Sequence, residues 1–158
     1  MTRRRSILSG LIMIGFAAVL PAGQAGAQSA KDLVGTWTLV SADAFGTNPK
    51  GTFIFDANGH FTAILVRADL PKYAANNRSQ GTEAENRTTV NGSLAYFGTY
   101  SLSGSDLNFH IEGSTFPNWS GTNQKRTNVA ITGDELKYVQ PTPSGGGAPT
   151  AVVWKRVK

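Results

Sequence analysis

The chain has no cysteine, and this absence removes several classes of chemistry at once. It excludes disulfide bonds, thiolate nucleophiles and cysteine-ligated metal sites. Histidine is also scarce, because His60 and His110 are the only two in 158 residues and neither lies at the spacing of a zinc motif. We therefore expect neither a bound metal nor a cofactor.

Charge is sparse as well, since Asp, Glu, Lys and Arg make up 16% of the residues. The formal net charge is +5, but Arg3, Arg4 and Arg5 contribute three of those positive charges. All ten acidic residues follow Ala27, so the chain beyond that point carries a net charge of +2. A nucleic-acid-binding surface needs a dense basic stripe, and the sequence contains none. We expect no nucleic-acid partner.

The one long apolar run, Ile7 to Leu20, is too short to span a bilayer comfortably. It follows the basic residues Arg3 to Arg5 and precedes Ala25-Gly26-Ala27, a small-x-small pattern that signal peptidase cleaves. Residues 1–27 are therefore predicted to be a cleaved export signal, which leaves no stable membrane span; an uncleaved anchor is the alternative. Arg4-Arg5-Ser6-Ile7-Leu8 fits a twin-arginine pattern, and a general secretory signal fits almost as well. Either route predicts a periplasmic or secreted protein.

Residues 28–158 have the length of one domain, and their pattern is typical of an all-β fold. Short alternating segments are separated by turn residues such as Asn58-Gly59, which favours a hairpin because both residues tolerate positive φ. Eight antiparallel strands at this spacing fit an up-and-down barrel or a sandwich, and we expect a monomer. The predicted strands are 33–42, 51–55, 60–67, 94–102, 106–113, 124–132, 135–140 and 151–157.

One segment, Ala68 to Ser93, is long for a hairpin loop. Thr82 and Glu85 match a capping box, in which the two side chains satisfy free amide groups at the start of a helix. We predict a short helix from Glu83 to Asn91. Between barrel strands, such a helix is interpreted as a lid over one mouth, and an irregular solvated loop is the alternative.

The two ends of this domain resemble the closed end of a lipocalin-type barrel. Gly35 precedes Trp37 by two residues on the first predicted strand, and Arg156 lies on the last. The resemblance implies that Arg156 lies over the indole of Trp37 and seals the floor. It also favours the barrel over the sandwich.

Three internal runs carry a more specific resemblance. Residues 67–78, 95–100 and 110–126 are similar to the bacterial and fungal lipocalin-like domain proteins, over essentially the whole of residues 28–158. The resemblance implies a compact calycin-type barrel, shorter than animal lipocalins and enclosing a cavity. It implies no particular reaction.

The polar candidates for the barrel mouth are Arg67, Asp69, His110, Glu112 and Arg126. In one interpretation an arginine clamps a carboxylate or enolate, and His110 or Glu112 acts as the acid–base group. In the other, the same residues form ion pairs that fix the loop, Arg67 with Asp69 and Arg126 with Glu112. Strand alternation puts His110 and Glu112 on one face, but it does not decide whether that face is the lumen or the solvent.

Aromatic side chains in the same runs are the predicted walls of the pocket. They are Tyr73, Tyr96, Tyr100, Phe116 and Trp119, whereas Phe53, Phe55, Phe61 and Phe109 are expected in the core. The leading hypothesis is an exported barrel that binds a small hydrophobic or amphipathic molecule with an anionic head. The alternatives are a cofactor-free isomerase, cyclase or hydratase that uses His110 and Glu112, and a structural envelope barrel without a ligand. Whether the protein is an enzyme stays open, and we favour a binding protein.

Overall fold

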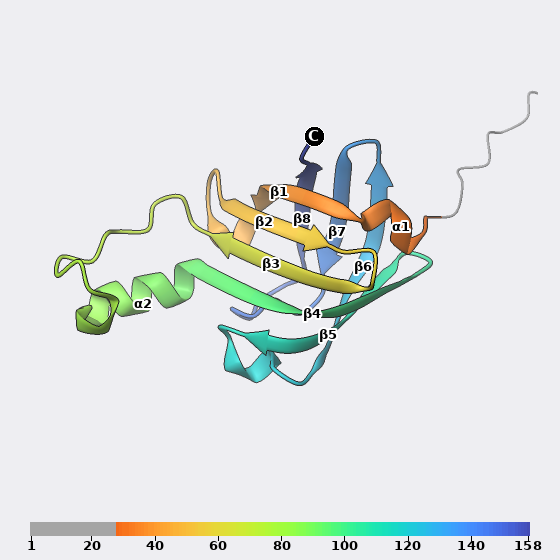
Figure 1. Cartoon of the computed structure of the whole chain (residues 1–158). Coiled ribbons are helices and arrows are strands. Elements are labelled where there is room, and N and C mark those ends of the chain that lie inside the picture. The colour runs from red at the N-terminus through yellow and green to blue at the C-terminus, as the bar shows by residue number, and fades with distance from the viewer. Residues whose placement is uncertain (1–27) are drawn as a thin grey trace, which may run out of the picture.

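The computed structural model describes residues 28–158, and the predicted export signal lies outside them (Figure 1). Each strand pairs antiparallel with the next, and β8 pairs with β1, so the sheet closes into a barrel of eight strands. The strands are β1 (Gly35–Ala42), β2 (Lys50–Phe55), β3 (His60–Val66), β4 (Ser93–Ser103), β5 (Asp106–Ser114), β6 (Asn123–Thr132), β7 (Glu135–Gln140) and β8 (Thr150–Arg156). The predicted all-β, up-and-down architecture is confirmed.

The start of the first strand differs from the prediction. Residues Ala30–Leu33 form the short helix α1, so β1 begins at Gly35 rather than at Leu33. The Asp32 carboxylate accepts from the Ser29 backbone N–H at 2.7 Å and from its hydroxyl at 2.9 Å, which holds this single turn together. These hydrogen bonds lower the pKa of Asp32, the backbone bond being the larger cause.

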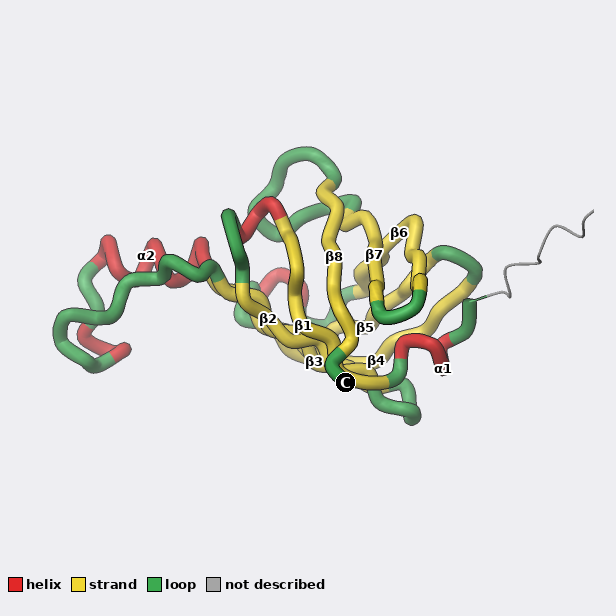
Figure 2. The backbone as a smooth tube through the Cα atoms, turned by 90° about the horizontal axis from the view of Figure 1, so that it is seen from above, coloured by secondary structure: helices red, strands yellow, loops and turns green. Residues whose placement is uncertain are grey.

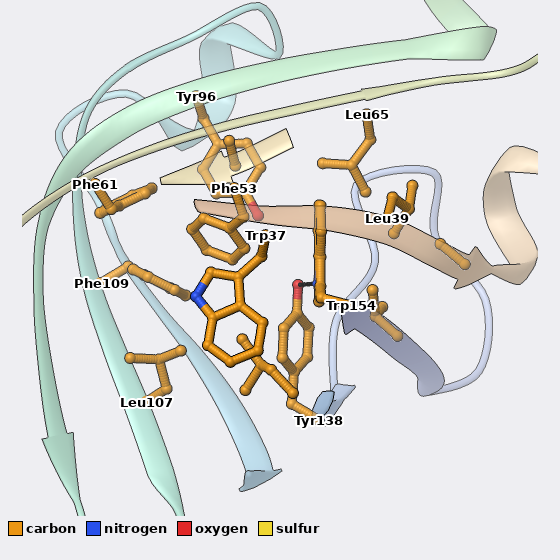
Figure 3. Packing of buried hydrophobic residues seen from close by; sticks show 14 of the residues in the cluster. Trp37, Leu39, Phe53, Phe61, Leu65, Tyr96, Leu107, Phe109, Tyr138 and Trp154 are labelled. Atoms are coloured by element: carbon orange, nitrogen blue, oxygen red, sulfur yellow. Dashed lines mark hydrogen bonds between the residues drawn. The ribbon is translucent and has the colours of Figure 1, made fainter. Parts of the chain in front are cut away.

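The half of the barrel nearest α1 is filled by aromatic side chains. Phe53, Phe55, Phe61 and Phe109 are all buried, as predicted, and Phe53 lies 4.1 Å from Phe55 and 5.8 Å from both Phe61 and Phe109 between ring centres. Figure 3 shows Phe53, Phe61 and Phe109, and Phe53 packs edge-on against Trp154 at 5.2 Å between ring centres. Rings packed at these distances leave little room for a ligand, so the solid core occupies one end of the barrel.

The closing residues meet at that same end. Trp37 pairs with Arg156 across β1 and β8, and the Arg156 guanidinium lies 4.1 Å from the centre of the indole. Gly35 lies beside them, and a Cβ atom there would come within 2.9 Å of Arg156 Nη1. A glycine at this position therefore gives the guanidinium its space.

The predicted helix in the long loop is present as α2 (Glu83–Gly92). Its capping box forms as expected: the Thr82 Oγ1 accepts from the Glu85 backbone N–H at 3.3 Å, and the Glu85 carboxylate accepts from the Thr82 backbone N–H at 2.7 Å. Only the last turn of α2 borders the barrel, and both views show the rest of the helix and its preceding loop projecting away from it (Figures 1 and 2). No helix within residues 28–158 combines the length and apolar character that a membrane crossing requires.

Candidate functional site

A cavity of about 520 Å³ lies in the half of the barrel opposite the closed end. It is bordered by strand ends and by the loops that join them at this mouth, together with the last turn of α2. Its lining residues include Ala42, Phe45, Leu65, Val90, Leu94, Tyr96, Phe116, Trp119, Arg126, Tyr138, Gln140, Thr150 and Val152. The volume is in the range that holds a small organic ligand.

The walls of this cavity are mainly apolar and aromatic. Trp119 lies on the 3₁₀ turn Pro117–Trp119 between β5 and β6, and its ring packs edge-on against Tyr96 at 5.4 Å between centres. Phe116 packs edge-on against Trp119 in turn, at 5.9 Å. Ala42 and Phe45 contribute from the opposite side of the barrel. These walls favour a ligand with a substantial apolar body.

Arg126 is the charged group in these walls, and its side chain is only 2% exposed. Its guanidinium donates to the backbone carbonyl oxygen of Lys125 at 3.0 Å and, at a longer 3.4 Å, to the Tyr96 hydroxyl. It also lies over the rings of Phe109 at 5.2 Å and Trp119 at 5.5 Å. Within the described residues, no carboxylate lies within 4.0 Å of it. The buried guanidinium therefore lacks an ionic partner among residues 28–158.

An irregularity in β6 allows Arg126 to face the cavity. The pairing of β6 with β7 shifts between Thr127 and Ala130, and Asn128 adopts a positive φ of 53°. Arg126 and Val129, three residues apart, are consequently both buried, which strict strand alternation would not permit. Because of the bulge, Arg126 points into the barrel and so does the apolar Val129 beyond it.

Tyr138 lies beside this group, deeper in the barrel. Its hydroxyl oxygen accepts from the Trp154 indole N–H at 3.0 Å, a bond drawn in Figure 3. Burial raises the pKa of Tyr138 well above its usual value, so its hydroxyl stays protonated. The hydroxyl protons of Tyr96 and Tyr138 find no acceptor among residues 28–158. Together with Arg126, they offer donors to an anionic oxygen.

Four of the residues predicted for the pocket, Tyr96, Phe116, Trp119 and Arg126, line this cavity. Arg67 and Asp69 do not; they form the predicted ion pair with each other, through two 2.9 Å hydrogen bonds near the loop surface. That pairing lowers the pKa of Asp69.

The two remaining predicted tyrosines also lie outside the cavity. Tyr73 lies in the projecting loop, against Gly81. Tyr100 lies toward the closed end, where its hydroxyl donates to the carbonyl oxygen of Asp56 at 2.8 Å and burial raises its pKa.

His110 and Glu112 are on the outer face of β5. Leu107, Phe109 and Ile111 point into the barrel, and both polar side chains are therefore exposed. His110 Nδ1 lies 3.0 Å from Asn123 Oδ1 on the neighbouring strand. The expectation that His110 and Glu112 lie near Arg126 at the mouth, with an Arg126–Glu112 ion pair, is wrong. These two side chains point out of the barrel, whereas Arg126 points into it.

Tyr138 and Gln140 are among the cavity residues that the sequence interpretation missed. Both alternate with exposed or half-buried residues on β7, following the fully buried Leu136, so they share the inward face. The available signal was a glutamine that continues an apolar stripe in the predicted strand 135–140. It was missed because the conspicuous charged residues lay in other runs.

A closed barrel of eight antiparallel strands with a cavity at one end is the architecture of a lipocalin-like protein. The family model described as a lipocalin-like domain matches residues 34–157, and the chain belongs to this family.

Among solved structures, the chain is similar to a lipocalin-like protein from Bacteroides uniformis, with 18% identity and a TM-score of 0.42 over 80% of this chain and 99% of that one. It is also similar to a mutant of the fluorescent protein UnaG, with 11% identity and a TM-score of 0.39 over 81% of this chain and 98% of that one. No curated protein matches the chain.

Proposed function

We propose that this protein is an exported binding protein for a small, largely apolar molecule with an anionic head group. The observation that supports this proposal is the buried guanidinium of Arg126, which has no carboxylate partner within the described residues. Burying an unpaired charge is unfavourable, and a fold tolerates it where a ligand supplies the counter-charge.

The cavity offers each part of such a ligand a matching surface. The Arg126 guanidinium and the hydroxyl groups of Tyr96 and Tyr138 would bind the anionic oxygens. Phe45, Trp119 and the neighbouring aliphatic residues would cover the apolar body. Export is supported by the basic, apolar and small-x-small pattern of residues 1–27.

Dodecanoate is a suitable first probe, because it joins a carboxylate to a simple apolar chain. We expect isothermal titration calorimetry to show saturable binding to the parent protein and a loss of tenfold or more in Arg126→Met. A charge-assisted hydrogen bond is worth about 1.5–3 kcal/mol, which corresponds to such a loss.

Arg67→Met is the matched control, since Arg67 is exposed and paired with Asp69 outside the cavity. Its affinity for dodecanoate should equal that of the parent. Equal losses in the two variants, or no binding to the parent, would contradict the proposal.

A further inference from the structure

The side chain of Gln28 is hydrogen-bonded to the backbone of β6, far away along the chain. Its Nε2 donates to the carbonyl oxygen of Val129 at 3.0 Å, and its Oε1 accepts from the N–H of Ile131 at 2.6 Å. The side chain is half-buried, and both polar atoms of its carboxamide have a partner. We call this pair of hydrogen bonds the Gln28 latch.

The Gln28 latch completes an edge of β6 that β5 does not reach. The register of β5 with β6 ends at the pair Leu107 and Arg126, and β6 continues beyond it toward the closed end. On that side the Val129 N–H donates to the carbonyl oxygen of Ser105 at 2.9 Å, in the turn before β5. The Gln28 carboxamide then supplies the next donor and acceptor, as a paired strand would.

Gln28 is also the residue that cleavage after Ala27 leaves at the N-terminus. The small-x-small pattern of residues 25–27 ends immediately before it. Cleavage gives Gln28 a free α-amino group, and such groups have a pKa of about 7.7–8.0, so an appreciable fraction is unprotonated near neutral pH. The unprotonated nitrogen is a nucleophile, and the Gln28 side-chain carbonyl carbon, Cδ, is an electrophile on the same residue.

Attack of this nitrogen on Cδ closes a lactam ring and converts the terminal glutamine to pyroglutamate. The N–Cδ bond forms, the Cδ–Nε2 bond breaks, and Nε2 leaves as ammonia with a proton from the amine. Val129 then loses its donor, and the carbonyl group is drawn back to the backbone nitrogen, away from Ile131. Cyclisation therefore breaks both hydrogen bonds of the Gln28 latch and requires this end of the chain to open locally.

We infer that Gln28 is a modification site whose reaction depends on folding: the barrel holds this N-terminal glutamine uncyclised, and cyclisation abolishes the Gln28 latch. The inference rests on the cleavage after Ala27, which belongs to the proposed function, and is independent of the ligand. A chain that folds first keeps the latch and a free amine. A chain that cyclises first folds without the latch and is less stable.

Intact-protein mass spectrometry tests this inference, because cyclisation removes the mass of one ammonia. The full chain would be expressed in a bacterium, and the exported protein incubated at about pH 8. The matched control carries one additional glutamine between Ala27 and Gln28, so its terminal glutamine has the same chemistry but lies outside the latch. We expect the folded parent to cyclise at least tenfold more slowly than the folded control, since it reacts only on local opening. In urea that unfolds both proteins, their rates should be similar.

Urea denaturation tests the latch itself. Parent protein that has cyclised while unfolded and is then refolded should have a lower urea midpoint than uncyclised parent, because Val129 and Ile131 have lost their partners. Control protein that has cyclised at its additional glutamine keeps the Gln28 carboxamide, so its midpoint should not change.

The possible failures separate the inference from the proposed function. If the folded parent cyclises as fast as the folded control, the inference is overturned and the proposed function stands. An unchanged midpoint after cyclisation at Gln28 also overturns it. If the mass of the exported protein shows a first residue other than Gln28, the inference and the cleavage site are both overturned, and the dodecanoate titrations still decide whether the protein binds its ligand.

Discussion

Arg156 lies over the indole of Trp37, with its guanidinium carbon 4.1 Å from the ring centre. The same guanidinium donates to the backbone carbonyl oxygens of Val34, at 2.7 Å, and Asp32. One side chain thus covers the floor of the barrel and ties the last strand to the segment that precedes the first. The closed end depends on this contact, and the open end is free to hold a ligand.

Replacing Arg156 with Met should lower the free energy of unfolding by about 2 kcal/mol, because a cation–π contact and two hydrogen bonds from a charged donor are lost. Urea denaturation measures this change. Lys155→Met is the matched control, since Lys155 is exposed on the adjacent position, and it should change stability by less than about 0.5 kcal/mol. If Arg156→Met unfolds like the parent, Arg156 does not close the barrel.

Replacing Arg126 with Met should have the opposite effect on the ligand-free protein. The substitution removes a buried charge that has no ionic partner in residues 28–158 and keeps much of the side-chain volume. We expect the free energy of unfolding to stay the same or to rise by about 1–2 kcal/mol, as it does when buried ionic groups are replaced by apolar ones. If urea denaturation instead shows that the free energy of unfolding falls by more than about 2 kcal/mol, Arg126 is needed for the stability of the fold.

The strands were predictable because each one is half-buried and reads as a clear alternation. In β1, Trp37 and Leu39 are buried and Thr36, Thr38 and Val40 are not fully buried, as the sequence pattern indicates. The turn at Asn58-Gly59 was predictable for a local reason as well, since Gly59 takes a φ of 89°. Such features depend on neighbouring residues only.

The site was less predictable, because it depends on which residues meet across the lumen. Alternation groups His110 with Glu112 correctly but does not say which face is inward, and that choice is made by the packing of Phe109 against Phe53 and Phe61. The bulge at Asn128 that keeps Arg126 buried has no clear signature in the sequence either. Tertiary packing decided both.

The projecting loop should loosen in acid. The Glu85 carboxylate accepts from the backbone N–H groups of Ala74, at 2.8 Å, and Thr82, and these bonds lower its pKa below the ordinary value of 4.5. A carboxylate with a lowered folded-state pKa stabilises the fold above its unfolded pKa, so this contribution is complete above about pH 4.5 and is lost as pH falls through the folded value.

Amide hydrogen exchange at Ala74 and Thr82 would report this loosening. Their protection should fall below pH 4.5 in the parent, after correction for intrinsic exchange, and should be low at all pH values in Glu85→Gln. Glu83 is the control, because its carboxylate pairs with Arg87 on the helix surface and bonds neither amide. Glu83→Gln should therefore retain the protection that Glu85→Gln loses. Unchanged protection in Glu85→Gln would contradict the account of the loop.

His110→Ala should leave ligand binding unchanged. The His110 side chain is on the outer face of β5, hydrogen-bonded to Asn123, and does not line the mouth cavity. Titration of the variant with dodecanoate should give the parent dissociation constant within twofold. A tenfold loss of affinity, with the fold intact by circular dichroism, would place the ligand outside the barrel lumen.

The central claim is that Arg126 binds the negative charge of the ligand, and a comparison of ligand charge across two proteins tests it most directly. Dissociation constants of dodecanoate and its uncharged methyl ester would be measured for the parent and for Arg126→Met. The account predicts that the parent prefers dodecanoate at least tenfold and that Arg126→Met removes this preference, because the two changes delete the same interaction. The same ratio of dissociation constants in both proteins would contradict it.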